Sequence, residues 1–156
     1  GPDEKQVREE GERIYAPAKR RGGMDWKELT AGICKVRQDS CGETKSEALL
    51  RLGLRTFAEI RRRELLEVTA RNPHELVHVL EAFGMISVGE AALHACLARR
   101  ASSETLHFKR SDYPQVDPPE WNKFVTVRKH GNDVVAGEKP FHFWLPFEEN
   151  YRRHGS

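Results

Sequence analysis

One short stretch of the chain gathers side chains that could bind an anion or a partner protein. It holds the Arg99-Arg100 pair, then His107, Lys109 and Arg110, with the carboxylate of Asp112 beside them. A planar guanidinium suits bidentate contact with a carboxylate or another anion, which a lysine cannot reproduce. The functional interpretation is contact with an anionic ligand or a partner subunit. The competing interpretation is a helix end whose cations complement the helix dipole, together with an ordinary Arg–Asp pair.

A second stretch has the spacing of a zinc site. His74-Glu-Leu-Val-His78 matches the His-Glu-x-x-His motif, which on a helix places two imidazoles on one face with a carboxylate between them. Asn72-Pro73 puts His74 in the first helical turn, and no second motif supplies a third ligand. We therefore predict a metal-free helix start, and a zinc hydrolase using His74, Glu75 and His78 is the less favoured alternative.

Other catalytic and cofactor motifs are missing from the sequence. The chain contains no Gly-x-Gly, so it lacks the glycine loop that lets backbone amides approach a dinucleotide phosphate. No Gly-x-Ser-x-Gly motif presents a serine nucleophile, and Cys34 is predicted to lie in the core. We assign no catalytic, cofactor-binding or metal-binding residue within this chain.

Composition narrows the class of protein. The 156 residues suffice for one domain with a hydrophobic core, although 32% are charged. The mean hydropathy is −0.70, which indicates extensive solvated helix surface. Lys and Arg number 26 against 24 Asp and Glu, so no global field favours nucleic acid as a partner.

The sequence also bears on location. We predict that no apolar run approaches the ~20 residues that span a bilayer, so direct membrane insertion is not expected. The three cysteines, Cys34, Cys41 and Cys96, form no Cys-x-x-Cys and are predicted to be free thiols in the cytoplasm, with a Cys34–Cys41 disulfide as the alternative. Residues 1–2 resemble a protease scar, and the chain is expected to be a piece of a longer protein.

Helix signals recur through the first hundred residues. Capping residues, prolines and glycines mark the expected boundaries. The predicted helices cover 3–15, Met24-Asp25 to Cys41-Gly42, the capping box Thr44-Lys-Ser-Glu47 to about Ala70, a helix begun by Asn72-Pro73, and a small-residue helix over 87–101. Trp26, Leu29, Ile33 and Val36 form one apolar stripe, and Leu50, Leu54, Phe57 and Leu65 form another.

The spacing of apolar residues changes in the C-terminal tail, residues 117–156. Residues 124–128 and 134–136 flank His130-Gly-Asn-Asp133, which predicts a β-hairpin, and Phe141-His-Phe-Trp-Leu145 is an aromatic segment expected to pack back. The predicted fold is mainly α, a three-helix-type bundle with a small C-terminal β-hairpin and an extended tail. We expect the bundle to cover 3–116, with the hairpin and tail of 117–156 packed on the same domain.

Several segments resemble one known family. They are 101–124, Glu12-Arg-Ile-Tyr-Ala-Pro17, 25–33, Ala70-Arg-Asn-Pro-His-Glu-Leu76, and the small-residue segment 84–94. Together they resemble the C-terminal helical domain of the fumarate reductase/succinate dehydrogenase flavoprotein family, which includes L-aspartate oxidase and the adenylylsulfate reductase α subunit. The resemblance also accounts for the His-Glu-x-x-His match as ordinary helix sequence of the family.

The resemblance implies a parent enzyme, an FAD-dependent oxidoreductase that carries out flavin-mediated electron transfer. Its FAD-binding and capping domains would precede this chain, which alone would be inactive and bind no FAD. The implied partners are those upstream domains and an iron–sulfur electron-transfer subunit, through which a cytoplasmic protein could associate with a membrane. His107, Lys109, Arg110 and Asp112 would then be contacts to a domain or subunit.

The chain departs from the family pattern at this cluster. Fumarate reductases usually show Glu-Ser-Arg-Gly-x-His-x-Arg-x-Asp-x-Pro, whereas this chain has Ser103-Glu-Thr-Leu-His107 followed by Phe108-Lys-Arg-Ser-Asp-Tyr-Pro114. The Arg-Gly pair is missing and one residue is added after the histidine, so a dicarboxylate substrate does not follow. The main alternative is a non-enzymatic helical interaction module that docks through 61–63 and the aromatic tail. A flavoprotein fragment should expose an apolar patch, whereas a self-contained module should not.

Overall fold

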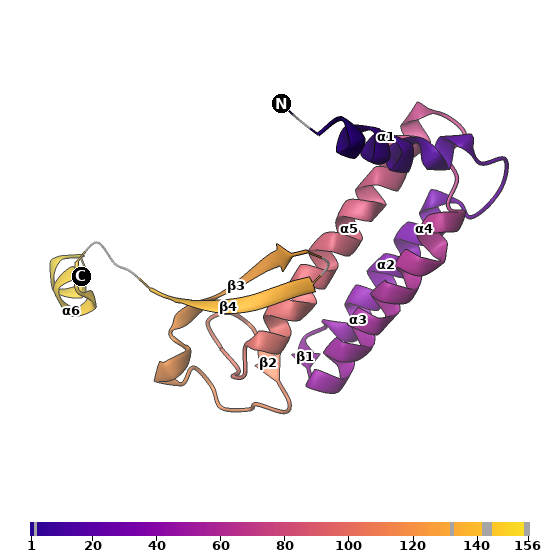
Figure 1. Cartoon of the computed structure of the whole chain (residues 1–156). Coiled ribbons are helices and arrows are strands. Elements are labelled where there is room, and N and C mark those ends of the chain that lie inside the picture. Colours follow the sequence, from indigo (N-terminus) through magenta and orange to yellow (C-terminus); the bar gives the residue numbers. More distant parts are fainter. Residues whose placement is uncertain (2, 132, 142–144, 155–156) are drawn as a thin grey trace.

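The computed structural model describes residues 1, 3–131, 133–141 and 145–154. It confirms a mainly α fold with a C-terminal hairpin (Figure 1). The helices are α1 (Glu4–Lys19), α2 (Trp26–Ser40), α3 (Glu47–Arg62), α4 (Glu64–Glu67), α5 (Pro73–Ala98) and α6 (Phe147–His154), with a short 3-10 turn at Pro119–Trp121. The strands are β1 (Thr44–Lys45), β2 (Lys109–Arg110), β3 (Lys123–His130) and β4 (Asp133–Pro140).

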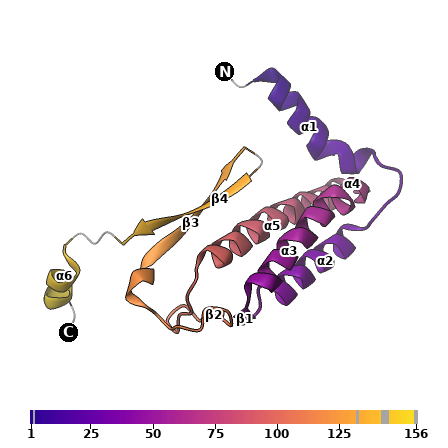
Figure 2. The same ribbon diagram turned by 60° about the horizontal axis from the view of Figure 1, so that its bottom comes forward.

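Helices α2, α3 and α5 lie side by side and form the three-helix bundle (Figures 1 and 2). Their buried side chains come from all three helices and include Leu29, Ile33, Leu50, Phe57, Ile86 and Leu93. Small residues allow the close approach that the sequence predicted for α5. A Cβ built on Gly89 would lie 2.8 Å from the Phe57 ring, so this contact requires glycine.

Side-chain caps begin the main helices. Asp25 and Asn72 cap α2 and α5 as predicted, accepting bonds from the amides of Lys27 and Glu75. The predicted cap of α3 is wrong by two residues, because Ser46 rather than Thr44 accepts the bond from the Leu49 amide. Thr44 instead belongs to β1, whose partner is β2 about 65 residues later in the chain.

Three helix boundaries also differ from prediction. Helix α1 continues past Pro17, which is buried and whose carbonyl accepts a bond from the Ala70 amide at 3.1 Å. Helix α3 ends at Arg62 rather than near Ala70, since the short helix α4 follows and the backbone of Glu67 and Thr69 then bonds to Met24. Finally, α5 is one continuous helix where two were predicted, because Gly84 lies on its exposed side and costs only backbone entropy there.

Helix α5 corrects the expectation about apolar runs. It is 26 residues long, and its most apolar stretch has a mean hydropathy of 1.5, which meets the length and composition of a membrane span. Its inner face packs against α2 and α3, and the helix also contacts α1 and the hairpin. We therefore interpret it as the core helix of the bundle.

The predicted core was partly out of phase. Cys34 is exposed, because it follows Ile33 by one residue and so points about 100° away from the buried side of α2. Trp26 and Leu54 are only partly buried, at the edge of the core.

The hairpin has the predicted strands and turn. Strands β3 and β4 pair antiparallel from Lys123↔Pro140 to His130↔Asp133, and Gly131 takes a positive φ of 61° in the turn. The ribbon lies near the C-terminal half of α5, and α6 stands apart from the bundle (Figure 1). Of the predicted aromatic tail, Phe141 packs edge-on against Phe124 at 4.3 Å, whereas residues 142–144 lie outside the described residues.

Candidate functional site

Arg110 is the centre of the predicted cationic cluster, and it is buried. Only 1% of its surface is exposed. Its Nε and Nη2 donate to the two carboxylate oxygens of Asp112, each at 2.7 Å. Its Nη1 donates to the carbonyls of Cys96 at 2.5 Å and Arg99 at 3.0 Å, which lie at the end of α5. The guanidinium thus satisfies free carbonyls at a helix C-terminus while forming a bidentate ion pair.

Asp112 extends this network to the next helix. Its Oδ2 accepts a bond from the Glu47 amide at 2.8 Å, at the start of α3. The hydrogen bonds from Arg110 and from the Glu47 amide lower the pKa of Asp112 to about 2. The Arg110–Asp112 pair therefore places a positive group at the end of α5 and a negative group at the start of α3, as both helix dipoles favour.

Two further residues of the predicted cluster are on the surface. His107 and Lys109 are exposed, and His107 has a φ of 48° in the tight turn that Ser103 and Phe108 close through two backbone hydrogen bonds. The structure therefore separates these four residues into a buried pair, Arg110 and Asp112, and an exposed pair, His107 and Lys109. Any contact of Arg110 with another domain would be indirect.

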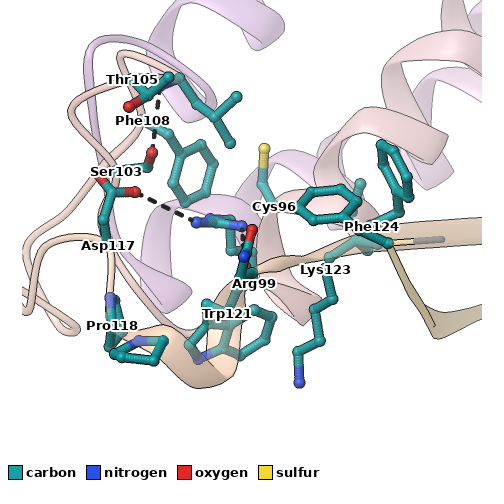
Figure 3. Close-up of a pocket in the computed structure, with 16 residues that line it drawn as sticks. Cys96, Arg99, Ser103, Thr105, Phe108, Asp117, Pro118, Trp121, Lys123 and Phe124 are labelled. Atoms are coloured by element: carbon teal, nitrogen blue, oxygen red, sulfur yellow. Dashed lines mark hydrogen bonds and ion pairs between the residues drawn. The ribbon is translucent and has the colours of Figure 1, made fainter. Parts of the chain in front are cut away.

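A cavity of about 590 Å³ opens beside this corner, between the end of α5, the segment 117–119 and the base of the hairpin (Figure 3). Its walls are mostly aromatic and apolar. Arg99 enters it between the rings of Phe108 and Trp121, at 6.0 Å and 5.6 Å from the ring centroids. Lys123 lies 4.5 Å from the centroid of Trp121 on the outer side.

Arg99 belongs to the predicted cationic cluster, but its place in this cavity was not predicted. Its Nη1 donates to the Trp121 carbonyl at 3.4 Å, and its Nη2 lies 3.9 Å from the Asp117 carboxylate. Within the described residues its buried Nε has no hydrogen-bond partner. The sequence offered the Arg99-Arg100 pair as charge at a helix end or as a contact for an anion or partner. The stacking of Arg99 between two rings depends on residues that follow later in the chain.

The His-Glu-x-x-His segment does not assemble its three polar side chains. His74 and His78 face each other, with their Nε2 atoms 3.2 Å apart. The ring of Trp26 stacks on that of His78, with 4.1 Å between the ring centroids. Glu75 points elsewhere, accepting bonds from the backbone and side chain of Arg71. No group of three potential metal ligands occurs among the residues that the structure describes.

One apolar surface of the bundle has no cover from the described chain. It is the outer face of α5, where the exposed valines Val77 and Val88 lie on the same side as Gly84 and the charged Glu81, opposite the buried side of the helix. Val77 is 53% exposed and Val88 68% exposed. The hairpin adds Phe124, 55% exposed, and Val135. These exposed apolar side chains are the candidates for the surface that the flavoprotein interpretation expects.

Comparisons with known proteins agree with this architecture. The family model described as fumarate reductase flavoprotein C-term matches residues 31–151. A search of curated protein sequences returns no match.

Similar solved structures share the fold. Mycobacterium smegmatis Sdh1 in complex with UQ1 has a TM-score of 0.80 at 20% identity, covering 97% of this chain and 26% of that one. Adenylylsulfate reductase from Archaeoglobus fulgidus has a TM-score of 0.82 at 17% identity, over 94% of this chain and 26% of that one. E. coli quinol fumarate reductase has a TM-score of 0.74 at 16% identity, over 94% of this chain and 27% of that one. The chain thus spans about a quarter of each of these structures, and it belongs to the fumarate reductase flavoprotein C-terminal family.

Proposed function

We propose that the chain is the C-terminal helical domain of an FAD-dependent oxidoreductase of the fumarate reductase, succinate dehydrogenase or adenylylsulfate reductase type. The family match over residues 31–151 supports the proposal. The uncovered outer face of α5 carries it, because a self-contained helical module would have little reason to expose this apolar surface. The chemistry would then belong to the parent protein, and this domain would contribute to its assembly.

The occupant of that face is the upstream part of the same parent chain. The related structures are about four times as long as the segment that matches, so most of such a parent lies outside these 156 residues. Helix α5 contacts both α1 and the hairpin, and the hairpin adds Phe124 and Val135 to the exposed apolar side chains of α5. Because Val77 is 53% and Val88 68% exposed, completing their burial would contribute about 1 kcal/mol each.

FAD binding is assigned to the upstream part as well. In the described residues, the parallel pair β1–β2 is only two residues long and no glycine loop joins a strand to a helix. These residues do not fit the diphosphate of a dinucleotide, which needs backbone amides at a glycine-rich turn. The domain therefore acts on the flavin only through the packing of its neighbours.

The exposed part of the cationic cluster is the proposed contact with a partner subunit. His107 and Lys109 project from the surface, while Arg110 and Asp112 hold the turn between them and the bundle. An electron-transfer subunit with an acidic surface suits this position, and membrane association would come through such a subunit.

Co-expression with the upstream part of the parent gene tests the proposal. The 156-residue chain should co-elute with that part as a complex containing FAD. Val88→Arg should abolish co-elution without changing the thermal midpoint of the isolated chain, since the side chain is exposed there. Leu66→Arg is the matched control, because Leu66 is 65% exposed but lies on α4. An upstream part that binds no FAD, or a complex indifferent to Val88→Arg, would contradict the proposal.

A further inference from the structure

Two of the three thiols face each other at the base of the bundle. Cys41 caps the end of α2 and Cys96 lies in the last turn of α5, 55 residues apart in sequence, with their Sγ atoms 3.7 Å apart. Cys34 lies about two helical turns before Cys41, which is about 10 Å along the helix axis. This distance exceeds the reach of a disulfide. The alternative Cys34–Cys41 bridge from the sequence is therefore disfavoured by this geometry.

The environment makes the two thiols unequal. The hydrogen bond from Cys96 and the nearby cations Lys45 and Arg37 lower the pKa of Cys41 to about 6. The same bond, together with burial, raises the pKa of Cys96. Lys45 is held close by its bond to the Gly42 carbonyl at 2.8 Å. Cys41 is thus the thiol of the pair that ionises more readily, and the Cys96 thiol donates to its sulfur.

We propose that Cys41 and Cys96 form a redox-active dithiol that closes to an intrachain disulfide by exchange with a small disulfide. The Cys41 thiolate attacks one sulfur of the small disulfide, forms a mixed disulfide and releases one thiolate, which takes up a proton. The Cys96 thiol then loses its proton to solvent and attacks the Cys41 sulfur, releasing the second small thiol. The two protein sulfurs are oxidised and the small disulfide is reduced to two thiols.

Both sulfurs can be reached and the bridge would join two distant elements. Cys41 is partly exposed, and Cys96 lines the 590 Å³ cavity. The carbonyl of Cys96 also accepts the bond from Arg110 Nη1, so the disulfide would tie the end of α2 to the Arg110 corner. The site rests on the thiol pair alone and is independent of the flavoprotein proposal.

Thiol mapping tests this inference. The reduced 156-residue chain is incubated with glutathione disulfide at neutral pH, alkylated, digested and analysed by mass spectrometry. The expected product contains a Cys41–Cys96 disulfide and an alkylated Cys34, and Cys34→Ser should form the same disulfide. In Cys96→Ser the reaction should stop at a glutathione adduct on Cys41, because the second thiol is missing.

The unsubstituted chain decides the outcome even if a variant folds poorly. Separate glutathione adducts on Cys41 and Cys96, or full alkylation of both after glutathione disulfide treatment, would overturn the proposal. A disulfide that includes Cys34, within one chain or between two chains, would overturn it as well.

Discussion

The core of the bundle and the hairpin differ in how much of their apolar side chains is exposed to water. In the bundle, Phe57 and Leu93 are fully buried among residues of α2, α3 and α5. On the hairpin, Phe124 and Val135 are largely exposed, although Phe124 does touch Phe141. The inner faces of the bundle helices find their packing partners inside this chain, whereas the hairpin, like the outer face of α5, leaves apolar side chains in water. The proposed docking of this domain on the upstream part of a parent protein would cover the apolar side chains of the hairpin.

Charged groups show the same contrast. Arg110 is buried, and its guanidinium donates hydrogen bonds to one carboxylate and to two carbonyls at the end of α5. On the hairpin, Lys123 pairs with the exposed carboxylate of Glu138 at 2.6 Å. A buried charge that loses its partner is costly, while an exposed ion pair contributes about 0–1 kcal/mol. The corner at Arg110 is thus part of what holds the bundle together.

The largest expected effect compares two phenylalanines. Phe57→Ala should lower the free energy of unfolding of the isolated chain by about 4 kcal/mol, because it removes a buried ring and leaves a cavity. Phe124→Ala should lower it by less than about 1 kcal/mol, since that ring is mostly in water. Urea unfolding followed by circular dichroism measures both. Equal losses would remove the contrast between bundle and hairpin.

A charge comparison should give the next largest effect. Arg110→Met should cost about 3 kcal/mol, because Asp112 and the helix-end carbonyls lose their donors. Lys109→Met, one residue away but exposed, should change stability by less than about 0.5 kcal/mol. Chemical denaturation of the two variants checks the difference. A tolerated Arg110→Met would mean that the corner is held by its backbone bonds alone.

Two glycines of α5 sharpen the picture of its two faces. Gly89→Ala should destabilise the chain by about 1–3 kcal/mol, because the new methyl group meets the Phe57 ring. Gly84→Ala should stabilise it by about 0.5–1 kcal/mol, because the site is open and alanine is the better helix former. Thermal melts of the pair suffice, and the same sign for both would show that the helix is rotated from its assigned phase.

The smallest effect concerns pH. The pKa of Asp112 is lowered to about 2 in the folded chain, below the value of about 3.9 for an unfolded aspartate. Its contribution to stability is therefore complete above about pH 4 and is lost as the pH falls through about 2. The stability gap between the unsubstituted chain and Asp112→Asn should narrow over this interval. Denaturant titrations at several pH values measure the gap, and a constant gap would argue against an ionised Asp112 as the cause.

Local chemistry predicted much of the fold. The cap at Asn72, the start of α2 at Asp25 and the turn at Gly131 all depend on neighbours in sequence, and all three are confirmed. Prediction failed where distant segments intervene. Thr44 does not cap α3, because it lies in a strand that pairs with β2. Helix α3 ends early, because Glu67 and Thr69 form backbone hydrogen bonds with Met24.

The site shows the same limit. The sequence identified Arg110 and Asp112 as a pair, and the structure confirms their bidentate contact. It could not show that Arg110 is buried, because that depends on the carbonyls at the end of α5. Likewise, Cys41 and Cys96 meet where the ends of two helices come together, and no sequence motif predicts this contact.

Hydrogen exchange tests the central claim most directly. Amide exchange of β3, β4 and the outer face of α5 can be measured in the isolated 156-residue chain and in the intact parent protein. If upstream domains cover these surfaces, their amides should exchange at least about tenfold more slowly in the parent, while the amides of α3 around Phe57 should change much less. Equal exchange rates at the hairpin and the outer face in both proteins would contradict the account.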